Sequence, residues 1–310
     1  MRRTLVLLGA LLASFVIATP VGAITRGAPD ANEHPYVGEL LFYLPDEVDP
    51  RFSDLGGWFT CTGTLMDPTH VLTAGHCTFA VGLNGASTTD GGKDTTAATG
   101  GVGGNDIWFS TAEVTDFSML PPSSGFVPDH NAQRYADWRD ALNGSSEWHR
   151  GVATPHNLFD TNLFFLHDAG VVTLSSPIAM TRYGQLAGNG YLNKYATTAK
   201  HHAFEAVGYG LEKVTGKADF GGDTRRKSNP QVQQWKSNPP NTYLILTNNA
   251  ASGGTCFGDS GGPTFDTTTS RLVVAVTSFG LNNNCTGHGG VYRLDQPDDQ
   301  AFLAGFGIHP

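Results

Sequence analysis

Hydrophobic residues in this chain form short runs, several with alternating polar positions, instead of recurring at helical spacing. Gly, Pro, Asn and Asp bound the runs, a pattern typical of β-strands joined by turns. Many short strands in a chain with 39 Gly and 17 Pro predict an all-β sandwich or barrel. The predicted strands are Tyr36–Tyr43, Thr62–Met66, His70–Leu72, Leu163–Leu166, Gly170–Leu174, Ala203–Val207, Thr242–Thr247, Leu272–Phe279 and Gly290–Leu294.

Two segments depart from the strand pattern. Near the end of the chain, Gln296–Ala304 is predicted to be a helix, with Asp295 as its N-cap and Pro297 in its first turn. Residues 82–106 are rich in Gly, Thr and Asp and contain few large apolar side chains. Such a segment buries too little area to offset its ordering entropy, so we expect a long surface loop there.

The first 23 residues have the features of a secretory signal peptide. Arg2 and Arg3 precede an apolar run over Leu5–Ala18, and Val21-Gly22-Ala23 forms a small-residue cleavage site. A membrane anchor is the alternative, but the run is short for a span and has no charged far flank. We therefore expect a secreted protein that is cut after Ala23, with no membrane contact after cleavage.

Charge and cysteine content narrow the class of protein. The 310 residues carry a net charge of −9, which argues against nucleic acid or an anionic membrane as the main partner. Four cysteines in an exported chain suggest two disulfides, for which three connectivities are possible. The nearest-neighbour pairing, Cys61–Cys77 and Cys256–Cys285, would close one short loop in each half. A zinc site is the alternative, but the cysteines lack the usual spacing, and we expect no metal or cofactor.

Three short motifs contain residues suited to nucleophilic catalysis. They are "LTAGHC" at 72–77, "HDAGVVTL" at 167–174 and "TCFGDSGGP" at 255–263. Together they supply a histidine, an aspartate and a serine. Acyl transfer by a serine needs an imidazole to take its proton and a carboxylate to orient that imidazole.

These motifs resemble those of the trypsin/chymotrypsin-like serine proteases, and the resemblance runs from Ile24 to the C-terminal segment. It implies an all-β fold of two antiparallel six-stranded Greek-key barrels with a short C-terminal helix and an active site between the barrels. The protease domain would span 24–310 after the signal peptide 1–23. Its N-terminal barrel would cover about 24–178 and its C-terminal barrel about 179–310.

The resemblance also implies roles for the motif residues. Ser260 would be the nucleophile, His76 the general base and then the general acid, and Asp168 the carboxylate that orients His76. Asp160 is a rival for the last role, but an apolar strand directly follows Asp168 and would bury its carboxylate. The backbone N–H groups of Gly258 and Ser260 would form the oxyanion hole, where a Cβ would obstruct the turn.

Substrate preference is expected from the segments that match the walls of the family's primary pocket. No charged residue stands at the base of that pocket, and glycines at its walls leave room for a large side chain. We therefore expect an apolar or aromatic residue before the scissile bond. We also expect Ser278 to hydrogen-bond the Asp168 carboxylate. The predicted substrate-binding residues are Gly254, Thr255, Ser278, Phe279, Gly280 and Gly290.

The residue after the predicted signal cleavage site has a possible function of its own. Mature chains of the family typically begin Ile-Val-Gly-Gly, and this chain has Ile24-Thr25-Arg26-Gly27. By resemblance, the freed ammonium of Ile24 would pair with Asp259, a carboxylate that would be costly to bury alone. Because the cleavage site directly precedes Ile24, export alone would create the activating terminus.

Two other classes of protein are alternatives to a secreted, monomeric serine endopeptidase that acts on proteins or peptides. "GDSGG" also matches the G-x-S-x-G elbow of α/β-hydrolases, but that fold needs a helix after the serine and the order Ser, Asp, His. The other alternative is a protease-like binding protein without catalysis. The retained histidine, aspartate and serine argue against it.

Overall fold

The structure is a computed structural model that describes residues 24–48, 55–87, 103–121, 130–196, 202–215, 218–268 and 271–310. The predicted signal peptide lies outside these residues, as does most of the predicted loop 82–106. The described ends of that loop are partly on the surface: Leu83, Asn84, Ala86 and Ser87 are exposed as expected, whereas Gly82, Gly104 and Asp106 are buried. A Cβ on Gly104 would lie 1.8 Å from the carbonyl oxygen of Gly82, so the two ends approach through glycine backbone.

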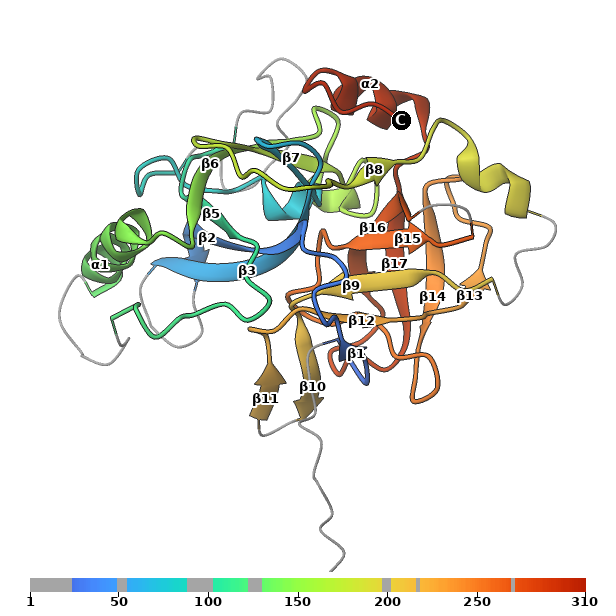
Figure 1. The fold of residues 1–310 in the computed structure, drawn as a ribbon, viewed down its shortest axis with the longest axis horizontal. Coiled ribbons are helices and arrows are strands. Elements are labelled where there is room, and N and C mark those ends of the chain that lie inside the picture. The colour runs from blue at the N-terminus through green and yellow to red at the C-terminus, as the bar shows by residue number, and fades with distance from the viewer. Residues whose placement is uncertain are drawn as a thin grey trace, which may run out of the picture.

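The N-terminal half forms a closed six-stranded barrel, in the order β2-β3-β4-β7-β6-β5, drawn blue to green in Figure 1. All of its neighbouring strands pair antiparallel. This barrel confirms the prediction for the first half. Its strands are β2 (Val37–Val48), β3 (Leu55–Leu65), β4 (His70–Thr73), β5 (Ile107–Ser110), β6 (His149–Pro155) and β7 (Gly170–Leu174).

Strand β2 is apolar on both faces because both faces are covered. Leu40 and Phe42 belong to the main core, whereas Leu41 and Tyr43 pack into a second, aromatic cluster. Helix α1 (His130–Gly144) contributes to that second cluster and lies on the outside of the barrel (Figure 1). The sequence did not predict this helix, since most of its residues are polar.

Most strands of a nine-stranded sheet come from the C-terminal half and are drawn yellow to red in Figure 1, whereas its first strand comes from the N-terminal end and is drawn blue. Six strands were expected; the nine include β1, which pairs with β12 at one edge, and β8, which pairs parallel with β16. Since β1 pairs with β12, the first described residues attach to this sheet and not to the N-terminal barrel. The path runs β1 (Ala28–Pro29), β12 (Arg226–Ser228), β9 (Glu205–Gly208), β15 (Pro263–Asp266), β16 (Leu272–Gly280), β17 (Gly287–Arg293), β14 (Tyr243–Asn248) and β13 (Val232–Gln234), with β8 (Gln185–Leu186) beside β16.

The remaining elements are short. A separate hairpin is formed by β10 (Leu211–Thr215) and β11 (Ala218–Gly221), and the 3₁₀ helices η1, η3 and η4 span Gly75–Cys77, Thr161–Leu163 and Tyr191–Tyr195. The C-terminal helix α2 (Pro297–Ala304) lies at the top of Figure 1.

Two local predictions were wrong. The apolar segment Leu163–Leu166 is not a strand: it overlaps η3, whose first turn is capped by the side chain of Asp160. The predicted C-terminal helix is present, but Asp295 does not cap it. Its carboxylate instead accepts hydrogen bonds from the buried guanidinium of Arg293, with Nε 2.9 Å from Oδ1. Burying a guanidinium without a carboxylate partner costs more free energy than leaving the end of a helix without a side-chain cap.

Candidate active site

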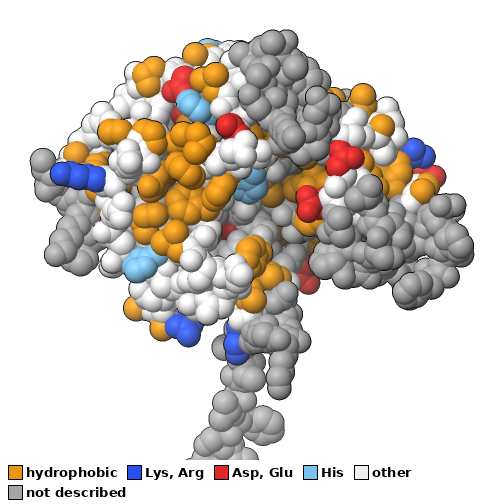
Figure 2. All heavy atoms as spheres, turned by 180° about the vertical axis from the view of Figure 1, so that it is seen from behind, with side chains coloured by type: hydrophobic (Ala, Val, Ile, Leu, Met, Phe, Trp, Pro, Cys, Tyr) orange, Lys and Arg blue, Asp and Glu red, His pale blue; other side chains and the backbone are white. Residues whose placement is uncertain are grey.

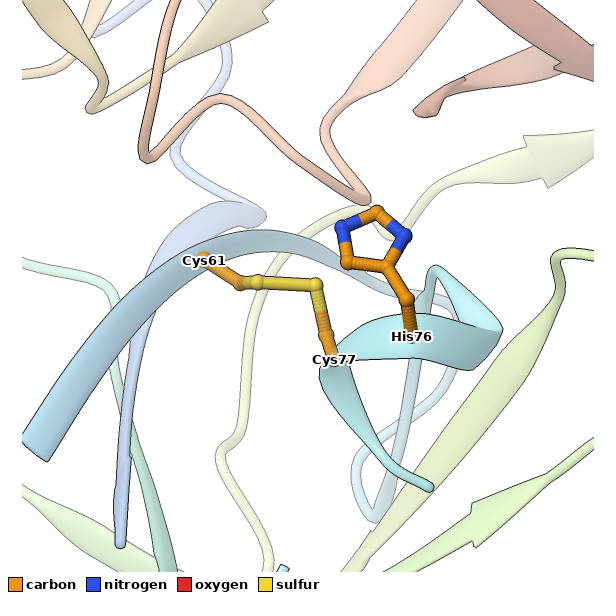
Figure 3. Close-up of side chains that lie close together, drawn as sticks. All are labelled: Cys61, His76 and Cys77. Carbon is orange, nitrogen blue, oxygen red and sulfur yellow. A yellow bond between two sulfur atoms is a disulfide. The ribbon is translucent and has the colours of Figure 1, made fainter. Parts of the chain in front are cut away.

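His76 lies in η1, directly after strand β4, between the two halves of the molecule. Figure 3 shows how the Cys61–Cys77 disulfide ties η1 to strand β3 next to the imidazole of His76. The side chain of His76 is 30 % exposed. The disulfide therefore holds the backbone of η1 in place while the imidazole remains accessible.

Asp168 is fully buried and accepts three hydrogen bonds that orient His76. The backbone N–H of His76 donates to Oδ1 at 2.9 Å, and Nδ1 lies 3.1 and 3.0 Å from the two carboxylate oxygens. The hydroxyl of Ser278 donates to Oδ2 at 2.5 Å, the contact expected from the sequence. Because a carboxylate only accepts, Nδ1 carries the proton of the neutral ring and Nε2 is left as a base.

The carboxylate also sets the basicity of His76. Burial lowers the pKa of His76, but the charge and hydrogen bond of Asp168 raise it by more, so the pKa lies above its ordinary value of 6.5. Asp160, the rival carboxylate, instead caps η3, where its Oδ1 accepts from the backbone N–H of Asn162. The geometry at His76 thus involves Asp168 and not Asp160.

Ser260 sits in a tight turn that contacts the strand leading to His76. Gly258 and Gly261 have φ of +94° and +77°, values that L side chains rarely adopt. A Cβ on Gly261 would lie 2.0 Å from Oγ1 of Thr73 and 2.6 Å from the backbone N of Ala74. Glycine at this position therefore allows the serine turn to reach the backbone just before His76.

Thr62 links the two halves at the same turn, a role that the sequence did not reveal. Its hydroxyl donates to the carbonyl oxygen of Gly258 at 2.9 Å, and its backbone N–H donates to that of Ser260 at 2.8 Å. The hydroxyl also accepts from the backbone N–H of Tyr209 at 3.1 Å. A threonine in a strand carries no signal for such a contact, because the partner lies nearly 200 residues away.

His76 and Ser260 both line a cavity of about 260 Å³. Of the predicted substrate-binding residues, Thr255, Ser278, Phe279 and Gly280 line it. Ser278 interrupts the β16–β17 register, and this irregularity directs its hydroxyl to Asp168. The other lining residues are Asn248, Cys256, Phe257, Thr277, Asn282, Cys285 and His288.

Two predicted pocket residues do not line this cavity. A Cβ on Gly254 would lie 2.4 Å from Cγ of Asn248, so that neighbouring side chain fills the space in front of it. A Cβ on Gly290 would lie 2.2 Å from the ring of Phe279, which covers it. In both cases another side chain lies between the glycine and the cavity. The sequence alone does not show these contacts.

Ile24 and Asp259 are both fully buried and bond to one residue, Gly210. The backbone N–H of Ile24 donates to the carbonyl of Gly210 at 3.4 Å, and the N–H of Gly210 donates to Oδ1 of Asp259 at 2.8 Å. Burial raises the pKa of Asp259 to about 7, although the backbone N–H groups of Cys256 and Gly210 oppose this. An ionised Asp259 is therefore costly in this environment.

Both disulfides have the nearest-neighbour pairing expected from the sequence, Cys61–Cys77 and Cys256–Cys285. Although the sulfurs of the first lie near a ring nitrogen of His76, they are bonded to each other and are not thiolate ligands for a metal ion.

A second cluster of metal-ligating side chains contains His156, His167, Asp298 and Asp299. Nδ1 of His156 accepts from the backbone N–H of Leu158 at 3.1 Å, so the proton of the neutral ring is on Nε2. Burial and the neighbouring His167 lower the pKa of His156 to about 4, so the ring is neutral near pH 7. Nε2, the nitrogen that faces Asp299 at 3.9 Å, then has no lone pair for a metal ion.

Comparisons with known proteins agree with the geometry. The family model described as Trypsin matches residues 129–295, more than half of the chain. Among solved structures, one described as HL collagenase is similar in fold, with a TM-score of 0.58 and 15 % sequence identity over 93 % of this chain and 100 % of that chain. No curated protein matches the chain. Asp168 and Ser260 lie within the residues matched by the family model, and His76 lies before them.

Proposed function

Because the chain belongs to the trypsin family of serine proteases, we propose that it cleaves peptide bonds with a catalytic triad of Ser260, His76 and Asp168. The observation that carries this proposal is the buried Asp168 carboxylate, which is bonded to Nδ1 of His76 at the edge of the cavity that Ser260 also lines. A serine hydroxyl, a neutral imidazole and an orienting carboxylate are the groups that acyl transfer requires.

In the first half of the reaction, Oγ of Ser260 attacks the carbonyl carbon of the scissile peptide, and its proton passes to Nε2 of His76. The backbone N–H groups of Gly258 and Ser260 stabilise the oxyanion that forms, each donor being worth about 3 kcal/mol in the transition state. The C–N bond then breaks, and Nε2 returns the proton to the departing amine. Asp168 balances the charge of the imidazolium between these transfers.

In the second half, water replaces the amine. The oxygen of the water attacks the acyl carbon while Nε2 of His76 takes a proton from the water. Nε2 then gives this proton to Oγ of Ser260 as the carboxylic acid leaves. The enzyme is regenerated without a cofactor in this scheme.

We propose that the residue before the scissile bond is apolar or aromatic. None of the residues that line the cavity is Asp, Glu, Lys or Arg, and Gly280 leaves one wall open. The ring of Phe279, which lines the cavity, contacts those of Phe164 and Tyr243, with centroids 6.1 and 5.5 Å apart, so an aromatic cluster supports this wall. One face of the molecule carries a broad area of hydrophobic side chains, which Figure 2 shows.

We further propose that the protein is secreted and that export produces its active N-terminus. Two disulfides support an oxidising compartment. Among the described residues, the structure contains no helix that is long and apolar enough to cross a membrane. Placement of Ile24 against Gly210, whose N–H binds Asp259, supports activation by cleavage directly before Ile24. N-terminal sequencing of the secreted, active protein should begin at Ile24, and any other start would contradict this step.

A serine-directed phosphonate probe tests the enzymatic role. The mature protein and a Ser176→Ala control, altered at an exposed serine, should both become labelled, whereas Ser260→Ala should not. In a peptide-library digest, the mature protein and Ser176→Ala should then cleave after apolar or aromatic residues, and Ser260→Ala should not cleave. Correctly cleaved protein that takes up no label would instead favour a protease-like binding protein.

A further inference from the structure

By resemblance to the family, the residue six positions before Ser260, which is Gly254, would form the base of the primary pocket, but another side chain lies there. Gly254 has no side chain, and the space that its Cβ would occupy lies only 2.4 Å from Cγ of Asn248. Asn248 is the last residue of β14, is 3 % exposed and lines the cavity. Its carboxamide therefore takes the position that a side chain at residue 254 would have.

Hydrogen bonds fix the orientation of this carboxamide. Nδ2 of Asn248 donates to the carbonyl oxygen of Thr255 at 2.6 Å, and a carbonyl oxygen can only accept. Oδ1 must therefore face the other way, and there it accepts from the hydroxyl of Thr25. The base of the cavity is thus a neutral amide held on both sides.

Thr25 is also joined to the neighbouring backbone. Its hydroxyl lies 3.0 Å from the carbonyl oxygen of Gly254, and the N–H of Gly254 donates to the carbonyl of Thr25 at 3.2 Å. Thr25 is the second residue after the predicted cleavage site, where related chains typically have valine. Valine could not donate to Oδ1 of Asn248, so this departure from the family pattern has a partner in the pocket.

We propose that Asn248 is the residue that sets charge selectivity at the base of the primary substrate pocket, and that Thr25 positions it. The proposal rests on the proposed function, because it concerns the residue before the scissile bond. A neutral amide at the base favours an uncharged substrate side chain, since a cation there would lose its hydration without gaining a counter-charge. The bond from Thr25 also makes the base of the pocket depend on where the N-terminal segment docks.

The first test places a carboxylate at the base of the pocket. Asn248→Asp keeps the acceptor for Thr25 and adds a charge, while Asn249→Asp makes the same change at the next residue, whose side chain is exposed and does not line this cavity. Binding of benzamidine, an aromatic cation, is measured by titration in the Ser260→Ala background. We expect Asn248→Asp to bind it at least about tenfold more tightly than the parent, and Asn249→Asp to match the parent.

In the active background, the ratio of kcat/KM for lysine over phenylalanine substrates should rise by a similar factor in Asn248→Asp alone. Equal benzamidine affinity in the two Asp variants would overturn the proposal. If the parent neither cleaves peptides nor takes up the serine probe, the proposed function fails. A gain of benzamidine affinity in Asn248→Asp would still support the assignment of the pocket base in that case.

The second test addresses Thr25 and does not depend on Asn248→Asp folding. Thr25→Val removes the hydroxyl with little change of shape, and Thr25→Ser keeps it. We expect Thr25→Val to raise KM for the preferred substrate about fivefold or more with kcat retained, because the base of the pocket loses its tether while the triad is untouched. Thr25→Ser should have the parent's KM. Equal KM values for the two variants would refute the positioning role.

Discussion

The buried carboxyl of Asp259 should affect the stability of the protein in opposite directions, depending on whether the chain begins at Ile24 or continues ahead of it. Its pKa is raised from 3.8 to about 7 by burial. A difference of about three pKa units corresponds to about 4 kcal/mol between the charged and neutral forms. In a chain that continues ahead of Ile24, no ammonium group is present to offset that cost.

The perturbation is Asp259→Asn, made in two forms of the Ser260→Ala protein: one that begins at Ile24 and one with two extra residues ahead of it. In the extended form at pH 8, the substitution removes an ionised buried carboxylate, a gain of about 4 kcal/mol. It also replaces an acceptor that faces the N–H of Cys256 at 2.8 Å, a loss of about 1 kcal/mol. The net expectation is about 3 kcal/mol of stabilisation.

In the form that begins at Ile24, the same substitution leaves the N-terminal ammonium buried without its counter-charge. Breaking such a buried pair typically costs about 3–5 kcal/mol. The effect of Asp259→Asn on the free energy of unfolding should therefore change sign between the two forms. Urea denaturation at pH 5 and pH 8 measures it.

The pH dependence gives an internal check on the extended form. Since the pKa of Asp259 is higher in the folded state than in the unfolded state, the folded state binds more protons between about pH 4 and 7. The stability that this group contributes is therefore lost as pH rises through that window, and Asp259→Asn should abolish the loss. Asp299→Asn, at another fully buried carboxyl, serves as the control and should act alike in both forms. An effect of the same sign in both forms at Asp259 would refute the pairing.

Three further predictions concern the active site and its disulfides. Asp168→Asn should lower kcat about 10³-fold or more. It should also move the acid limb of the kcat/KM profile to lower pH, because Asp168 raises the pKa of His76 and the reaction needs that ring neutral. An acid limb at unchanged pH would count against this role. Ser278→Ala removes a hydrogen bond to the Asp168 carboxylate and should cost about 1.5–3 kcal/mol in the activation free energy, seen as a fall in kcat/KM; unchanged kinetics would contradict it. Replacing Cys256 and Cys285 by alanine should lower the free energy of unfolding by about 3–4 kcal/mol through loop entropy and raise KM, since both residues line the cavity. Replacing Cys61 and Cys77 should cost a similar amount of stability in urea denaturation but lower kcat. The reverse pattern of KM and kcat would refute these roles of the two disulfides.

Local features of the sequence were sufficient where the chemistry is local. Eight of the nine strands predicted from short apolar runs coincide with observed strands, but other observed strands, among them β5, β6 and β15, were not predicted. The three motifs marked His76, Asp168 and Ser260 before any geometry was known. The strand that follows Asp168 indicated that its carboxylate would be buried, and it is. Each of these inferences depended on a few consecutive residues, whose spacing along the chain carries the information.

Tertiary structure decided what depends on partners far apart in the chain. Thr62 holds the serine turn from the other half of the molecule, and Asn248 fills the space before Gly254 because β14 ends there. Asp295 binds Arg293 instead of capping α2, because a buried guanidinium without a carboxylate partner would be costly. The hydrophobic pattern of the sequence does not show that Arg293 is buried. The sequence by itself determined which reactive groups are present and which predicted strands they lie next to. Only the packing of the two halves decided which side chains line the cavity and which carboxyl is left without a cation, because burial and long-range hydrogen bonds set those energies.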